Sequence, residues 1–180
     1  MDNDIQVQYT AIRLGVSTGL PITVLHIGED QTAIAFGTDV EPEAVLVLSI
    51  GSNRTAIDFF KHTPPTPGEM ETAIMGVEDE VTRARKLLTG HPTLFTRDVS
   101  IRELALIAGV SDQSEMILSL EAVERTFDLL ASLVLGRPAS SAGIPTNPAF
   151  AATLLILREF MHHLQFESIR IGNLKYMIRT

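Results

Sequence analysis

The chain has 180 residues, of which 45% are hydrophobic, and its formal net charge is −8. This length fits a single domain, and the hydrophobic content is sufficient for a buried core. The negative charge argues against nucleic acid as a partner, because non-specific binding to nucleic acid requires a basic surface. Cysteine is absent, the first residues are polar and acidic, and no apolar run reaches the roughly 18 residues of a membrane span. We therefore expect a cytoplasmic protein with no disulfides and no membrane segment.

The first part of the chain, about residues 8–61, is predicted to form strands. Its apolar runs are short, rich in Val, Ile, Leu, Thr and Phe, and separated by glycine or by acidic residues and proline. These runs are AIRLGV, PITVLHIG, QTAIAFGT, EAVLVLSIG and RTAIDFF. Two of them are almost continuously apolar, which is typical of strands covered on both faces.

The rest of the chain, about residues 66–172, is predicted to alternate helices with strands. Residues that favour helix starts recur along it: Thr66 with Pro67 and Glu69, Ser100 with Glu103, Ser119, and Asn147 with Pro148. The runs TLFTRD and ESIRIG between and after these helices are predicted strands. The expected fold class is therefore α/β, in one domain over 1–180, with a mixed sheet that begins with antiparallel strands and is flanked by helices.

A short polar turn, Gly51-Ser52-Asn53-Arg54, follows the apolar run 45–50 and raises a functional question. Small residues let backbone amides converge on a phosphate, and an arginine beside them can pair with it. The alternative is that the turn only joins two strands and that Arg54 is a solvated edge charge. The sequence leaves both interpretations open and favours the structural one.

Two clusters of titratable residues have weaker functional interpretations. His162 and His163 are adjacent on a predicted helix, so their side chains point in different directions and lack the i, i+4 spacing of metal ligands. The acidic run Glu78–Glu80 suggests acid–base chemistry, but a solvated helix face explains it more simply. We expect no metal site at either cluster.

Four segments in chain order resemble a known family. They are VLHIGEDQTAIAFG, VLSIGSNRTAIDFFKHTPPTPGEMETAI, TLFTRDVSIRELALIAGV and GIPTNPAFAATLLILREFMHHLQFESIRIGNLKYMI, within residues 11–176. Together they are similar to the C-terminal part of the Ppx/GppA family, the exopolyphosphatases and guanosine pentaphosphate phosphohydrolases. The resemblance implies a single lobe of the actin-like ATPase (RNase H-like) fold, with the family's first lobe unmatched in this sequence.

The residues that match the family's first phosphate loop depart from its pattern. Where the family has Asp-Ile-Gly-Gly-Gly-Ser-Thr-Glu, this chain has the stretch 28–32, with Glu29 and Asp30 among its residues. These carboxylates repel a phosphate at close range unless a metal ion bridges them. Gly28 and Thr32 remain as candidate ligand contacts.

Other positions that the resemblance marks as functional are also changed. His26 stands where the family has the strand aspartate linked to magnesium, and Thr10 where we place the catalytic glutamate. The stretch Arg97-Asp98-Val99 matches a Gly-Gly-Thr loop without any glycine. Ser49 replaces the aspartate of the Asp-Ile-Gly-Ser-Asn motif that opens the family's first lobe. The chemistry of phosphoryl transfer requires charge neutralisation and a positioned water, and these substitutions remove the groups that supply them.

Two functional hypotheses follow from the sequence. The favoured one is a non-catalytic half-domain that acts by self-association as a homodimer or by binding a partner protein. The alternative is a protein that binds or hydrolyses a phosphate ester, polyphosphate or nucleotide at the 28–32 and 51–54 turns, as an exopolyphosphatase-like hydrolase. Its candidate ligand residues are Gly28, Thr32, Gly51, Ser52, Asn53 and Arg54. Mg²⁺ enters only with such a phosphate ligand, and no metal ligand is predicted otherwise.

Overall fold

A mixed six-stranded sheet with strand order β3-β2-β1-β4-β6-β5 lies at the centre of the computed structural model, which describes residues 2–172. The strands are β1 (Ile22–Ile27), β2 (Thr32–Gly37), β3 (Ala44–Leu48), β4 (Thr93–Thr96), β5 (Glu115–Ser119) and β6 (Ser168–Gly172). The first three strands pair antiparallel, β1, β4 and β6 run parallel, and β5 is antiparallel to β6. The predicted fold class, α/β with early antiparallel strands, is confirmed.

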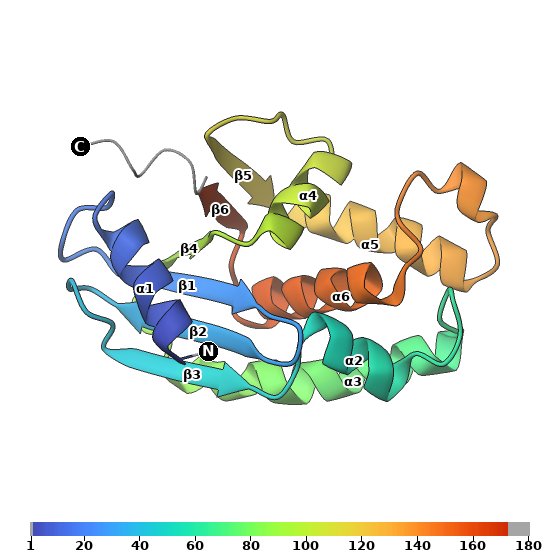
Figure 1. The fold of residues 1–180 in the computed structure, drawn as a ribbon, viewed down its shortest axis with the longest axis horizontal. Helices are drawn as coiled ribbons and strands as arrows, with labels where there is room; N and C mark the ends of the chain where they lie inside the picture. The colour runs from blue at the N-terminus through green and yellow to red at the C-terminus, as the bar shows by residue number, and fades with distance from the viewer. Residues whose placement is uncertain (1, 173–180) are drawn as a thin grey trace.

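Helices cover both faces of this sheet, unequally (Figure 1). They are α1 (Asp2–Arg13), α2 (Ser52–Phe59), α3 (Pro67–Thr82), α4 (Val99–Ile107), α5 (Leu120–Val134) and α6 (Pro148–His163), with 3₁₀ turns at Arg83–Lys86 and Ala139–Ser141. Helix α1 lies across β1 and β2, whereas α2, α3, α4 and α5 all contact α6 or the strands beside it. No helix among the described residues is long and apolar enough to cross a membrane.

The alternation of side chains along β1 separates two hydrophobic cores. Ile22 and Val24 point to the α1 side, where they pack with Ile5, Tyr9 and other residues of a small cluster. Leu25 and Ile27 belong to the larger cluster on the opposite face, which includes the buried residues of α3, α5 and α6. Both sides of β1 are therefore buried, which explains its continuously apolar sequence.

Several predicted helix starts are confirmed. Thr66 forms a complete capping box with Glu69 ahead of α3. The side chain of Ser119 accepts a hydrogen bond from the amide of Ala122 at the start of α5. Asn147 caps α6 through the amide of Phe150.

Other predicted elements are wrong. Residues 11–13 of the run AIRLGV and residues 54–59 of the run RTAIDFF, expected as strands, are helical in α1 and α2, because one side of each helix is apolar and the other is solvated. The expected Ser100–Glu103 capping box is absent: Asp98 is the N-cap of α4, and its side chain does not cap the helix. Strand β5 is not among the predicted strands, although its residues alternate between exposed and buried. Residues 173–176 of the family resemblance lie outside the described residues.

Candidate functional site

The carboxyl ends of β1 and β4 bring His26 and Asp98 together. Because these strands are parallel neighbours, His26 near the end of β1 and Asp98 just after β4 meet at one edge of the sheet, where ligands of open α/β sheets bind. The Nδ1 atom of His26 lies 2.6 Å from Oδ1 of Asp98, and Oδ2 of Asp98 accepts a hydrogen bond of 2.7 Å from the amide of Ile27. The amide of Asp98 donates to Oγ1 of Thr96 at 3.1 Å. The buried Asp98 carboxylate is thus fixed by β1.

This pairing determines the electrostatics of the edge. The hydrogen bond to Asp98 raises the pKa of His26 above its ordinary value, and partial burial of the imidazole opposes that rise. The position that the resemblance matched to a magnesium-linked aspartate therefore carries an imidazole already bonded to a carboxylate. Because both Asp98 oxygens have partners within the chain, the pair can hold or release a proton at His26.

The two turns predicted to hold a phosphate contact each other directly. The amide of Ser52 donates to the carbonyl of Gly28 at 2.9 Å. The amides of Asn53 and Arg54 donate to the carbonyl of Glu29 at 2.9 and 3.0 Å. The first amides of a helix are the groups that normally bind an anion at its N-terminus. In α2 these amides are already bonded to the β1–β2 turn.

Gly51 permits this close contact between the two turns. A Cβ atom at Gly51 would lie 2.6 Å from the carbonyl carbon of Asp30 and closer still to the carbonyl oxygen of Glu29. Its φ of −159° is extended backbone that any residue adopts, so only the lack of space requires glycine here. The glycine serves a packing contact between two pieces of backbone.

Most of the predicted ligand residues do lie at one junction. Gly28 lies directly after β1. Gly51 to Arg54 form the start of α2, so the turn at 51–54 joins strand β3 to a helix and not to another strand. The Oγ atom of Ser52 lies 3.4 Å from the carbonyl of Gly28. Arg54 is exposed, and its Nε atom lies 3.6 Å from Oδ2 of Asp58 on the same helix. Thr32 is fully buried at the start of β2, and its Oγ1 has no hydrogen-bond partner. Ligand binding at these residues stays a prediction.

The described residues contain no group of three or more His, Asp or Glu side chains arranged to hold a metal ion. His163 pairs with the buried Glu159 at 3.0 Å, and His162 with Glu124 at 3.4 Å. The two imidazoles use different partners but do not diverge as expected, because their ring centroids lie 5.2 Å apart. Glu29 and Asp30 are exposed on the β1–β2 turn. The donors that Mg²⁺ prefers, oxygen ligands converging on one point, are not assembled among the residues that the structure describes.

A cavity of about 240 Å³ lies where the N-termini of α2, α4 and α6 approach each other. Its lining includes Ser52, Ser100 and Phe150. Beside it, α4 presents exposed apolar side chains to solvent, with Val99 57%, Leu106 42% and Ile107 36% exposed. We call these three residues the α4 stripe. Nothing in the sequence pattern distinguishes the stripe, because the same residues also fit a buried helix.

No protein-family model and no curated protein sequence matches the chain, whereas solved structures do. A Ppx/GppA enzyme of Aquifex aeolicus superposes with a TM-score of 0.76 at 19% identity, over 96% of this chain and 60% of that one. An exopolyphosphatase of Cytophaga hutchinsonii has a TM-score of 0.72 at 16% identity, over 96% and 59% of the two chains. An exopolyphosphatase-like protein has a TM-score of 0.71 at 14% identity, over 94% and 63%.

These likenesses define the class of fold: the chain has the actin-like ATPase fold as it occurs in Ppx/GppA proteins. The chain spans about 60% of the length of the Aquifex and Cytophaga proteins. The resemblance read from the sequence is confirmed at the level of the fold. Fold alone does not carry activity, because the chemistry of a chain depends on its own residues.

Sequence reasoning singled out His26 and Asp98 separately but missed their pairing. Each follows an apolar run that ends at the same edge of the sheet, and this was the signal available. Using it requires knowledge that β1 and β4 are neighbours. That neighbour relationship depends on the whole sheet order, which no local pattern contains.

Proposed function

We propose that this chain is a non-catalytic binding module that acts in the cytoplasm by pairing with a second copy of itself or with a partner protein. The observation that carries the proposal is the closure of the α2 N-terminus. The amides of Ser52, Asn53 and Arg54 donate to carbonyls of the β1–β2 turn, so they do not form a phosphate cradle. The acidic side chains of Glu29 and Asp30 on that turn add repulsion against an anion.

The loss of catalytic groups supports the same interpretation. His26, at the position matched to the magnesium-linked aspartate, is bonded to Asp98. The α4 helix starts at Val99 without a glycine-containing loop before it. Hydrolysis of a phosphate ester needs charge neutralisation by a metal ion or by aligned donors, and a positioned water. At this edge of the sheet, His26 and Asp98 hydrogen-bond to each other instead.

The α4 stripe is the surface that suits protein association. Val99 and Leu106 are seven residues apart, so they share one face of the helix, and Ile107 extends that face towards the cavity beside Phe150. Exposed apolar side chains mark protein interaction sites, and here Val99 and Leu106 lie on either side of Arg102 and Glu103 on the same helix. A two-fold pairing would place the stripe of one copy against that of another and remove both from water.

Sedimentation velocity tests this proposal. We expect the parent chain to sediment as a dimer that persists on dilution through the micromolar range. The double substitution Leu106→Glu and Ile107→Glu should convert it to a monomer, because it places charges in the buried interface. Both side chains are exposed in the monomer, so the fold itself should tolerate the change, and a thermal melt verifies that it does.

Ile57→Glu is the matched control, because Ile57 is an apolar side chain of α2 that is 70% exposed. It should leave the dimer intact. A parent chain that is monomeric at every concentration would overturn self-association. A stripe variant that sediments like the parent would show that another surface mediates pairing.

Phosphate binding is the second candidate function, and the exposed side chains at the start of α2 favour it. Asn53 and Arg54 face solvent at the positive end of the helix dipole, where a guanidinium and an amide can contact an anion without using backbone amides. Under this alternative a phosphate ester, polyphosphate or nucleotide binds the 28–32 and 51–54 turns. Arg54→Ala should then abolish binding, and unchanged binding in that variant would exclude the site.

A further inference from the structure

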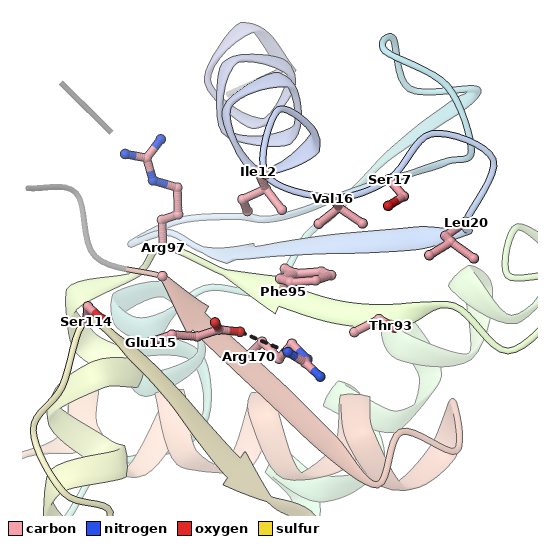
Figure 2. A pocket seen from close by; sticks show the side chains of 12 residues that line it. Ile12, Val16, Ser17, Leu20, Thr93, Phe95, Arg97, Ser114, Glu115 and Arg170 are labelled. Atoms are coloured by element: carbon pink, nitrogen blue, oxygen red, sulfur yellow. Dashed lines mark hydrogen bonds and ion pairs between the residues drawn. The ribbon is translucent and has the colours of Figure 1, made fainter. Parts of the chain in front are cut away.

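A groove of about 530 Å³ lies on the α1 side of the sheet, and its described lining residues include none of the β1–β2 turn or of the α4 stripe. One wall is the end of α1 and the loop after it, with Ile12, Val16 and Leu20. The floor is β4, whose Phe95 sits in the middle of the groove between Val16 and Arg170 (Figure 2). The opposite wall comes from β5 and β6. The groove forms because α1 makes most of its sheet contacts with β1 and β2, which leaves the β4-β6-β5 part of this face less covered among the described residues.

The size and lining of the groove are those of a small-molecule site. Ligand pockets typically measure about 300 to 1,000 Å³ and combine apolar walls with a few polar groups that fix orientation. Here Ile12, Val16 and Phe95 supply an apolar surface that is partly covered and partly open. A flat protein partner would need a much larger contact area than this groove provides.

Arg97 is an unpartnered cation of the groove. Among the residues that the structure describes, its guanidinium has no ion pair and no hydrogen bond, and its Nε is buried without a partner. Arg97 as a whole is half-buried, but burying its Nε donor without an acceptor is costly, and a carboxylate is one acceptor whose planar geometry matches a guanidinium. The chain as a whole is acidic, with 22 Asp and Glu against 14 Lys and Arg.

A second arginine strengthens the local charge. Arg170 of β6 points along the groove, and its Nη1 lies 3.0 Å from Oε1 of Glu115 on β5 (Figure 2). Both of these side chains are about half exposed, so this ion pair is weak and can rearrange. Arg97 and Arg170 both line the groove, and Glu115, the one carboxylate among its described lining residues, is paired with Arg170.

We propose that this groove binds a carboxylate-bearing amphiphile, with the apolar body against Ile12, Val16 and Phe95 and the carboxylate on Arg97. Charge complementarity argues for this ligand. The apolar walls favour any apolar chain, and the unpaired guanidinium of Arg97 favours one that carries a carboxylate. The residues of the groove differ from those that carry the proposed function, so this binding activity goes beyond it.

The experiment is a titration of the ¹⁵N-labelled chain with decanoate below its micelle concentration, followed by backbone amide signals. We expect saturable shifts at Val16, Phe95 and Gly172, which border the groove. Decanol, which has the same chain without the charge, should bind more weakly by roughly tenfold, because a charge-assisted hydrogen bond to carboxylate is worth about that factor. Decyltrimethylammonium should bind more weakly still.

Arg97→Ala should weaken decanoate binding by about the same factor and leave decanol unaffected. The matched control is Arg125→Ala on α5, an exposed arginine paired with Glu121 away from the groove. It should bind decanoate as the parent does. Comparing decanoate with decanol on the parent chain keeps the test decisive even if the Arg97 variant does not fold.

Three results would overturn the proposal. Equal affinity for decanoate and decanol would show that no head group is recognised. Shifts spread over exposed apolar residues elsewhere, such as Ile57 and Met75, would show non-specific adsorption. Shifts at Val16 and Phe95 that depend on protein concentration, with no decanoate binding, would assign the groove to a second copy of the chain.

Discussion

His26 and Asp98 lie 72 residues apart in sequence and 2.6 Å apart in space, with Nδ1 of the imidazole against Oδ1 of the carboxylate. The contact joins the end of β1 to the start of α4. It also explains why Asp98, although it is the N-cap residue of α4, does not cap the helix with its side chain. Its oxygens are committed to His26 and to the amide of Ile27. The position that the resemblance matches to a magnesium-linked aspartate is thus occupied by His26, which joins the end of β1 to the start of α4.

This pair predicts a pH dependence of stability. Asp98, followed by Asp4 of α1, raises the pKa of His26 above its ordinary value of 6.5. A raised pKa means that the folded chain holds this proton more tightly than the unfolded chain. The resulting stabilisation is complete below pH 6.5 and is lost as the pH rises through the higher pKa of the folded state.

Urea unfolding at a series of pH values measures this effect. Above pH 6.5 the parent's free energy of unfolding should fall as His26 loses its proton. His26→Gln lacks this titrating group, so its free energy of unfolding should not show that part of the fall. His162→Gln, which changes an exposed histidine paired with Glu124 at 3.4 Å, should decline as the parent does. A parent whose pH profile is superimposable on that of His26→Gln would contradict the assignment.

Gly51→Ala should destabilise the chain by roughly 1 to 3 kcal/mol, because the added methyl group meets backbone atoms that cannot rotate away. The nearest of these atoms is the carbonyl oxygen of Glu29. Gly68→Ala is the matched control: it lies in the first turn of α3 with nothing within 4 Å of the position that its methyl group would take. That change should be neutral or stabilising by up to about 1 kcal/mol. Denaturant midpoints of both variants provide the comparison.

Arg13 should be a large contributor to stability, although it has no carboxylate in its hydrogen-bond shell. It is 2% exposed and donates to the carbonyls of Leu20 and Gly37 at 3.0 and 2.8 Å, and to the hydroxyl of Tyr9 at 3.2 Å. Arg13→Met should cost roughly 2 to 4 kcal/mol, because it leaves the buried carbonyl of Gly37 and hydroxyl of Tyr9 without this donor, and the partly buried carbonyl of Leu20 as well. The loss should appear in chemical unfolding.

Arg125→Met is the control for that substitution, since Arg125 is exposed and pairs only with Glu121 on its own helix. It should change the free energy of unfolding by less than about 0.5 kcal/mol. Equal effects of the two substitutions would show that the carbonyl contacts of Arg13 contribute little.

Local sequence signals predicted the elements whose signals are strong. The helix starts at Thr66 and Asn147 combine a capping side chain with proline at the next position, and both are confirmed. The early strands around 22–27 and 32–37 are apolar on both faces and were also predicted correctly. These features depend on a few neighbouring residues, so the sequence contains them directly.

The failures involve information that is not local. In the stretch 54–60, β-favouring residues suggest a strand, but packing of Thr55 and Ala56 against α6 with Ile57 exposed makes it a helix. The contact between Gly51 and the β1–β2 turn, like the pairing of His26 with Asp98, depends on the order of strands in the sheet. The groove at Arg97 depends on where α1 ends over that sheet, and no motif encodes it.

The closure of the α2 N-terminus by the β1–β2 turn is the feature on which the proposed function depends. The most direct test is a titration of the ¹⁵N-labelled chain with tripolyphosphate and with ATP, each with Mg²⁺, in which the amide signals of Gly28, Gly51, Ser52 and Asn53 are followed. Because these amides are already bonded to, or packed against, backbone carbonyls, we predict that their signals do not move. Saturable shifts at these residues that disappear in Arg54→Ala would contradict this closure and restore a phosphate site at the junction.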